Sequence, residues 1–464
     1  MGQDTCMMPT VIANMVRPYA AVIPQLIVSM TRLYDSASRR LGLLMIFVVG
    51  CILPGSGLIA QQAPFTDTTL LFNPSPEVVL SASSTTDSVK ASSTPKVGNY
   101  TMFHVPALVV TSKGTVLAFA EGRYGKGKDW DDMDLLLRRS SDGGNSWQPA
   151  QVVIPYTKGK PTSNITPIAD KNGTVHVLFQ VNYANAYYIK STDEGKTWST
   201  PVDITYVFDL FKKEYNWKVL APGPAHAIQL NNGRLLVPVW LCIPDKTRIG
   251  GDHRPSCVAT IYSDDNGKSW KRGDIISDDL DIPANSTDTI RNPNESVVVQ
   301  LTDGSVMINM RNESDSNRRL ISYSKDGISG WSKPAFDNDL FEPVCMASLI
   351  RVTGKGDDKS RLIFVNPDSR NNPIPTRKDK KVNKPRENIT ARLSYDEGKT
   401  WPLHKVMHER GSGYSDLAVD KKGMIYCLYE IRDGDNSDWK YRIVIRRFNL
   451  EWLTDGKDFI TKKK

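Results

Sequence analysis

The sequence predicts an all-β protein built as a propeller, and three observations lead to this prediction. An eight-residue phrase, Ser-x-Asp-x-Gly-x-Ser/Thr-Trp, recurs along the 464-residue chain, which is typical of an array of supersecondary units. Short apolar, strand-like runs flank its copies. Helical periodicity is scarce, and Val207 to Lys213 is the best candidate for a short turn of helix. These features favour small antiparallel sheets that close into a ring.

The recurring phrase, here called the Asp-turn repeat, has the chemistry of a hairpin turn. Four copies are complete, and a fifth has lost its Gly and Thr positions; the copies begin at Ser140, Ser191, Ser263, Ser324 (the worn copy) and Ser394. Their aspartates follow one another at intervals of 51, 72, 61 and 70 residues. A short polar side chain bonds its own backbone in such a turn, and glycine supplies a positive φ. The closing Trp can fold back over the turn and bury its ring.

Between the repeats, alternating and apolar segments bounded by turn residues predict the strands. Clear examples are residues 105–110, 115–120, 175–180, 234–240, 296–300, 305–310 and 424–429. The long intervals before the third and fifth repeats contain the loops Gly250 to Pro255 and Pro367 to Arg386. Because functional residues concentrate on loops held by a rigid scaffold, we expect these loops to build the mouth of a central site.

The chain divides into four parts. Residues 1–60 are expected to be a leader: Arg39 and Arg40 precede an apolar run, Leu41 to Leu53, that is shorter than the ~20 residues of a membrane span. This pattern predicts export without a stable membrane span, either as a soluble protein or as a lipoprotein anchored through Cys51. Residues 61–97 are expected to form a linker or N-terminal extension, residues 98–455 the propeller, and residues 456–464 a basic tail.

Composition limits the possible partners. The formal net charge is +8, which suits an anionic substrate or surface. The basic residues are dispersed and form no stripe interleaved with aromatic residues, so no nucleic-acid partner is predicted. The histidines and cysteines show no metal-ligand spacing, and we expect neither metal nor cofactor. Cys242 and Cys257 are either a disulfide between adjacent strands or two unrelated core residues.

Five Asp-turn repeats, with several segments between them, resemble the exo-α-sialidase (neuraminidase) family, in which such repeats are called Asp boxes or BNR repeats. The resemblance covers residues from about 99 to 450. It implies a six-bladed propeller and hydrolysis, with retention, of terminal α-linked sialic acid or a related keto sugar acid. Sialylated glycans, glycoproteins or glycolipids are the partners that it implies.

Three residues match the catalytic positions of that family. Tyr414, in Gly-Tyr-Ser-Asp-Leu, matches the nucleophile, and Glu295, in Arg-Asn-Pro-Asn-Glu-Ser, matches the glutamate that activates it. A neutral phenol suits this reaction because a carboxylate nucleophile would be repelled by the carboxylate on the reacting carbon. Asp129 lies nine residues before Arg138, in the register of the acid/base aspartate. It would protonate the leaving oxygen and then activate water.

Four further residues match the substrate-binding positions. Arg311, in Asn-Met-Arg-Asn, and Arg386, in Pro-Arg-Glu-Asn, match two of the family's three carboxylate-binding arginines. A planar guanidinium grips a carboxylate through two parallel hydrogen bonds. Glu121 and Arg123, in Phe-Ala-Glu-Gly-Arg, match positions that line the pocket near the ring hydroxyls.

One position departs from the family pattern. The family opens its first blade with aromatic-Arg-Ile-Pro, and this chain reads Phe103-His104-Val105-Pro106, so His104 stands where the first arginine is expected. Loss of a bidentate contact weakens carboxylate binding by about 1.5–3 kcal/mol. The departure leaves open a weak sialidase, one most active at acidic pH, an enzyme for another keto sugar acid, and a catalytically silent carbohydrate-binding propeller. A purely structural propeller is a further alternative, which the joint presence of Tyr414 and Glu295 disfavours.

His226, in Gly-Pro-Ala-His-Ala, is a further candidate. It lies in a loop that often faces the pocket in the family that the chain resembles. It is either a binding residue of that pocket or a histidine satisfied within its own turn.

Overall fold

The computed structural model describes residues 62–74, 79–81, 99–248, 250–353, 357, 359–371, 385–432 and 440–460. The predicted leader, with Cys51, and the lysines at 462–464 lie outside these residues. Among the residues described, no helix is long and apolar enough to cross a membrane.

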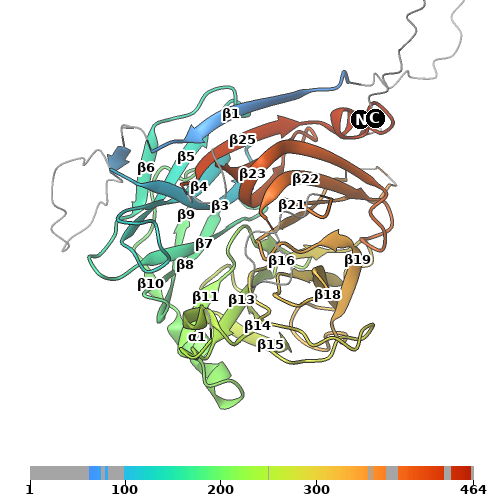
Figure 1. Ribbon diagram of the computed structural model, residues 1–464. Coiled ribbons are helices and arrows are strands. Elements are labelled where there is room, and N and C mark those ends of the chain that lie inside the picture. The colour runs from blue at the N-terminus through green and yellow to red at the C-terminus, as the bar shows by residue number, and fades with distance from the viewer. Residues whose placement is uncertain are drawn as a thin grey trace, which may run out of the picture. The chain divides into compact units, whose positions relative to one another are not determined.

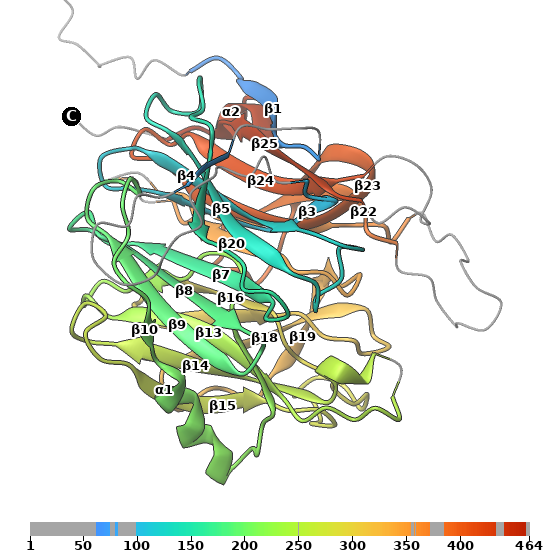
Figure 2. The ribbon, with the colours of Figure 1, turned by 90° about the vertical axis from the view of Figure 1, so that its left-hand side faces the viewer.

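The strands form five sheets arranged around a common axis, as Figures 1 and 2 show. The first sheet contains β2 (Val79–Ser81), β3 (Met102–Val110), β4 (Val116–Arg123), β5 (Met133–Ser140) and β6 (Ala150–Ile154). The second contains β7 (Thr162–Ala169), β8 (Val175–Val181), β9 (Asn185–Ser191) and β10 (Val202–Asp203). The third contains β11 (Val219–Pro222), β12 (Ile228–Gln229), β13 (Leu235–Cys242), β14 (Ser256–Ser263) and β15 (Lys271–Ser277). The fourth contains β16 (Ser296–Gln300), β17 (Val306–Met310), β18 (Arg318–Ser324) and β19 (Ala335–Phe341).

The fifth sheet has seven strands, because β23 belongs to two groups of strands. The sheet contains β20 (Ser348–Arg351), β21 (Leu362–Pro367), β22 (Glu387–Ser394), β23 (Leu403–Val419), β24 (Ile425–Ile431), β25 (Arg442–Phe448) and β1 (Thr66–Phe72). Residues 403–411 of β23 pair with β22, and residues 412–419 pair with β24. The predicted all-β propeller is therefore confirmed, but the six blades expected from the family resemblance are not six separate sheets. The chain runs from one group of strands into the next without a break in β23.

Apolar clusters between neighbouring groups of strands form the core. Trp147, for example, packs in a cluster that joins the first sheet to β24 and β25. The other four repeat tryptophans also pack between their own group and the preceding one; they are Trp198, Trp270, Trp331 and Trp401. Burying a ring at each contact stabilises the ring of sheets through roughly 25 cal/mol per Å² of apolar surface removed from water. The expected burial of the ring is complete for Trp270 and Trp401 and partial for the other three, and each ring packs where two groups of strands meet.

The Asp-turn repeats close the hairpins by a shared hydrogen-bond pattern. In the second repeat, Ser191 Oγ donates to Asp193 Oδ1 (2.8 Å) and accepts from the N–H of Gly195 (2.9 Å). The N–H and hydroxyl of Thr197 then donate to the Asp193 carboxylate at 2.9 and 2.7 Å. The other complete copies repeat this pattern. Gly195 has φ +74°, which a residue with a side chain rarely adopts.

The N-terminal strand completes the ring. β1 pairs antiparallel with β25, with Thr66 opposite Phe448, and Asp67 pairs with Arg447. Leu71 and Phe72 are buried in the cluster between the first and fifth sheets. Residues 66–72 lie in the stretch expected to be a linker or N-terminal extension. They are instead part of the propeller, because their apolar end covers a gap between two groups of strands.

Two smaller predictions have clear outcomes. The expected helical turn at residues 207–213 is confirmed by α1 (Thr205–Asp209) and η1 (Leu210–Lys213). Cys242 and Cys257 do not form a disulfide: both are free and buried. The register of β13 and β14 places Leu241 opposite Cys257, so the two thiols point to opposite faces of the sheet.

Candidate active site

The three residues at the centre of the site are brought together from two sheets. Tyr414 lies in the second half of β23, Glu295 immediately precedes β16, and Arg311 immediately follows β17. Tyr414 Oη donates to Glu295 Oε1 at 2.5 Å. Arg311 Nη1 donates to the other Glu295 oxygen and lies 3.2 Å from Tyr414 Oη. A phenol, a carboxylate and a guanidinium therefore share one hydrogen-bonded contact.

The environment of Tyr414 keeps its phenol protonated. Burial raises the pKa of Tyr414 well above its ordinary value of 10, although the charge of Arg311 opposes this rise. A nucleophilic phenolate is therefore not formed in the unliganded protein. The carboxylate of Glu295 accepts the hydrogen bond of the phenol and is therefore the group placed to take up its proton.

Arg386 lies over the ring of Tyr414. Its guanidinium stands 5.2 Å from the centre of the Tyr414 ring and donates from Nη2 to the carbonyl of Val344 (2.7 Å). Together with Arg311, which lies near the hydroxyl, it places two permanent positive charges beside Tyr414. This arrangement suits a substrate whose reacting carbon carries a carboxylate.

His104 is held at the start of β3 by Glu430, a residue of β24. His104 Nδ1 lies 2.5 Å from Glu430 Oε1, which also accepts the N–H of Val105 at 2.9 Å. The second Glu430 oxygen accepts the N–H of Tyr414 at 2.8 Å. The His104 ring is stacked on Tyr441 (centroids 5.3 Å apart) and tilted against Tyr414 (4.9 Å). Glu430 therefore fixes the substituted histidine and the backbone of Tyr414 together.

Glu121, Arg123 and Asp129 form a second network beside His104, since His104 and Glu121 are opposite one another on β3 and β4. Arg123 donates to Glu121 Oε2 from Nε (2.9 Å) and Nη2 (2.6 Å). Its Nη1 donates to Asp129 Oδ1 at 2.8 Å. Burial opposes ionisation of Asp129, but the charges of Arg123, His253 and His104 outweigh it and hold the pKa of Asp129 below its ordinary value.

The other aspartates of the same loop have structural contacts instead. Asp131 accepts the N–H groups of Lys126 and Lys128. Asp132 accepts the N–H of Gly159, and Asp134 accepts the hydroxyls of Tyr100 and Tyr124; these bonds brace the loop and the ends of the strands. Of the four, Asp129 is the one that accepts a hydrogen bond from Arg123.

The eight predicted site residues thus lie together, near the starts of β3 and β16. His226 lies apart from them. Its imidazole bonds Asp416 and lines a cavity at the opposite ends of these strands. The interpretation of His226 as a residue of the same pocket was therefore wrong, because the loop before β12 turns toward the other end of the channel.

Sequence reasoning missed two residues of the site. Glu430 is fully buried in an otherwise apolar strand, and such a charge inside a strand pattern is a signal that could have found it. His253 lies in the loop that was expected to form the mouth, with Nδ1 4.0 Å from Asp129 Oδ2. Its ring contacts Trp130, Tyr183 and Trp240. Nothing in the local sequence of this loop distinguishes His253 from an ordinary turn residue.

The model of a known family matches residues 114–427, and it describes a BNR repeat-like domain. The chain belongs to this BNR-repeat family.

Within the described ranges, no group of three or more His, Cys, Asp or Glu residues is placed to hold a metal ion.

Relatives of this BNR-repeat chain include bacterial proteins named as sialidases. It is 30% identical to a sialidase of Bacteroides fragilis over 367 residues, which cover 72% of this chain and 60% of that protein. It is 29% identical to a sialidase of Micromonospora viridifaciens over 383 residues, which cover 76% of this chain and 52% of that protein. The chain thus spans only about half to three fifths of the length of these two relatives.

A solved structure confirms the fold. The Trypanosoma rangeli sialidase in complex with 2,3-difluorosialic acid, described as a covalent intermediate, matches with a TM-score of 0.62 and 20% identity. The match covers 85% of this chain and 60% of that chain. At this identity the likeness establishes a shared propeller architecture for the BNR-repeat chain.

Proposed function

We propose that the chain is a retaining exo-α-sialidase that hydrolyses terminal α-linked sialic acid, or a related keto sugar acid, from glycoconjugates. The observation that carries the proposal is the contact of Tyr414 Oη with Glu295 Oε1, with Arg311 bonded to both. Relatives named as sialidases support the same reaction class.

In the proposed first step, Tyr414 Oη attacks the anomeric carbon while its proton moves to Glu295. The bond from that carbon to the leaving oxygen breaks, and Asp129, in its acid form, gives the leaving oxygen a proton. Arg311 and Arg386 hold the substrate carboxylate, and His104 faces it in place of the first of the family's three arginines. The product of this step is a glycosyl-tyrosine and a released alcohol.

In the second step, the Asp129 carboxylate takes a proton from water as the water oxygen attacks the anomeric carbon. The bond to Tyr414 breaks, and the phenolate recovers its proton from Glu295. Two attacks on opposite faces of the sugar give net retention. Because Arg123 favours the ionised form of Asp129 in the free protein, acidic pH favours the acid form that the first step requires.

The proposal is tested by hydrolysis of a fluorogenic sialoside between pH 4 and 8. We expect turnover that increases toward acidic pH, is abolished in Tyr414→Phe and falls about 10²–10⁴-fold in Glu295→Gln, since a general base contributes on this scale. Tyr206→Phe is the matched control, because the Tyr206 hydroxyl on α1 bonds the backbone of Trp270 and not a residue of the candidate site, so its loss should leave turnover unchanged.

A second candidate function is favoured by the presence of His104 at the position where the family pattern has a carboxylate-binding arginine. A catalytically weak or silent carbohydrate-binding propeller would bind sialic acid without releasing it from a glycoside. Absence of turnover at every pH, together with calorimetric binding of sialic acid that Arg311→Ala abolishes, would support this alternative and contradict the hydrolase proposal.

A further inference from the structure

A second cavity lies in the central channel, at the opposite end from the candidate active site. It has a volume of about 530 Å³, which is within the range of ~300–1,000 Å³ of small-molecule sites. The candidate active site uses the starts of β3 and β16, whereas this cavity is lined by their far ends, residues 108–110 and 298–300. Residues 349–351 and 417–419, at the ends of β20 and β23, also line it, as do Ala169, Lys171 and residues 226–229 and 231.

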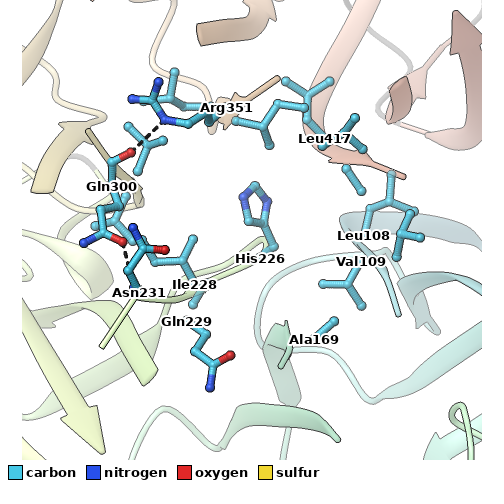
Figure 3. A pocket seen from close by; sticks show the side chains of 18 of the residues that line it. Leu108, Val109, Ala169, His226, Ile228, Gln229, Asn231, Gln300, Arg351 and Leu417 are labelled. Atoms are coloured by element: carbon cyan, nitrogen blue, oxygen red, sulfur yellow. Dashed lines mark hydrogen bonds between the residues drawn. The ribbon is translucent and has the colours of Figure 1, made fainter. Parts of the chain in front are cut away.

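His226 supplies a polar group inside the cavity. Figure 3 shows its imidazole among the lining side chains, between those of Gln300 and Leu108. The residue is 8% exposed, and its Nδ1 lies 2.6 Å from Asp416 Oδ1. Its Nε2 makes no hydrogen bond to the part of the chain that the structure describes. Because Nδ1 is committed to Asp416, Nε2 is the atom available to a ligand.

The Asp416 carboxylate fixes the orientation and charge of this imidazole. Asp416 is fully buried and also accepts the N–H of Leu108 (2.7 Å) and the hydroxyl of Ser348 (2.8 Å), so three groups of strands hold it. Burial opposes protonation of His226, but the charge of Asp416 outweighs it and raises the pKa of His226. The protonated ring presents Nε2–H as a charged donor to the cavity.

The remaining lining favours an anion with an apolar body. Lys171 and Arg351 are its charged side chains, and none of the described residues that line the cavity carries a carboxylate. Arg351 is paired with Glu397 and His226 with Asp416, so among the described residues Lys171 is the cation of the lining without a carboxylate partner, and His226 offers its Nε2–H as a donor. Most of the remaining lining is aliphatic, as Val109, Ile228, Leu417 and their neighbours show in Figure 3.

The geometry points to a second binding site, for a small monocarboxylate with a compact aliphatic body, whose carboxylate accepts a hydrogen bond from His226 Nε2. This proposal uses none of the residues assigned to hydrolysis, and its outcome does not depend on the proposed sialidase function.

The test is a titration of the full protein with isovalerate, and with isovaleramide as its neutral counterpart. Calorimetry measures affinity, and ¹H–¹³C spectra report the imidazole of His226, one of six histidines in the chain. We expect isovalerate to shift the His226 ring signals, and isovaleramide to bind roughly tenfold to a hundredfold more weakly because it lacks the charge. Binding of isovalerate should weaken as rising pH deprotonates His226.

A variant that fills the cavity keeps the test independent of the buried His226–Asp416 pair, whose removal could prevent folding. Ala169→Leu adds volume at the cavity wall. Ala284→Leu adds the same volume at an exposed position between β15 and β16, away from the cavity lining. We expect the first variant to lose isovalerate binding and the second to keep it.

Four results would overturn the proposal. The first three are that isovalerate does not bind, that isovalerate and isovaleramide bind equally well, and that Ala169→Leu binds isovalerate as the wild type does. The fourth is that the His226 signals do not shift while isovalerate competes with a sialoside for the candidate active site.

Discussion

At the scale of single residues, the candidate site contains the buried carboxylates Glu121 and Glu295, which are paired with Arg123 and Arg311. Glu430 is fully buried and accepts hydrogen bonds from the backbone of both Val105 and Tyr414 while it contacts His104. Arg123 links Glu121 to Asp129 in the same way. Removing one partner of such a pair leaves an uncompensated buried charge, which costs about 3–5 kcal/mol. The partners are thus needed for stability and also fix the groups proposed to react.

The role of His104 can be tested by restoring the residue that the family pattern expects. In His104→Arg, a guanidinium placed beside Glu430 would offer two parallel donors to the substrate carboxylate. If the chain is a sialidase, KM for a sialoside should fall roughly tenfold to a hundredfold, because the restored contact is worth about 1.5–3 kcal/mol. Steady-state kinetics measure this change.

His404→Arg is the control for this substitution, since His404 is exposed on the first half of β23. It should leave KM unchanged. An unchanged KM in His104→Arg, in a variant that keeps its thermal stability, would show that position 104 does not contact the substrate carboxylate.

At the scale of elements, the Asp-turn repeat is stable because one carboxylate satisfies several donors of a tight turn. Hydrogen bonds from the hydroxyl and N–H of Ser269 lower the pKa of Asp265 to about 2. The pKa values of Asp142, Asp193, Asp326 and Asp396 are lowered as well. In the worn copy, Asp326 keeps backbone donors, from Ile328 and Ser329, and so the hairpin persists without its Thr.

These lowered pKa values predict how stability depends on pH. A carboxyl whose pKa is lower in the folded state stabilises the fold above its unfolded value, ~3.9, and this contribution is lost as pH falls through the folded value. We therefore expect Asp265→Asn to lower Tm at pH 6, and the Tm difference from the wild type to narrow between pH 4 and pH 2. Thermal unfolding followed by circular dichroism measures this difference.

Asp315→Asn is the comparison, because Asp315 is exposed on the loop after β17. Its Tm should follow that of the wild type across the same range. A Tm difference for Asp265→Asn that stays constant from pH 6 to pH 2 would contradict the assigned cause.

At the scale of the whole molecule, the ring is held closed by residues from the two ends of the propeller. Asp67 of β1 and Arg447 of β25 are 380 positions apart in sequence. Without β1, the outer edge of β25 would expose unpaired backbone groups and the cluster around Leu71 and Phe72 would open to water. The stability of the propeller therefore depends on a short strand far from the site.

A pair of neighbouring leucines tests this dependence. Leu71 is 1% exposed and Leu70 is 44% exposed, although both lie in β1. Leu71→Ala should lower the free energy of unfolding by about 2–5 kcal/mol, the range for a buried Leu→Ala change. Leu70→Ala should cost much less, and urea unfolding measures both. Equal costs would show that β1 does not contribute to the core.

The sequence by itself determined the local features of the protein, namely the hairpin turns and the strands, because these depend on residues that are neighbours in the chain. The Asp-turn repeats specify their own hydrogen bonds within eight residues, and short apolar runs predict the strands, for instance residues 296–300, which β16 reproduces. Motifs around Tyr414, Glu295 and Arg311 identified residues that the fold then brought into one contact.

The tertiary structure decided how the strands are joined into sheets and which residues from distant segments come into contact. Sequence could not show that β23 continues through two groups of strands, that β1 closes the ring, or that the loop of His226 faces the far end of the channel. It also could not place Glu430 beneath both His104 and Tyr414. The contacts of β1 with β25 and of Glu430 with His104 follow from closing the ring, because only then do residues separated by more than 300 positions come within hydrogen-bonding distance.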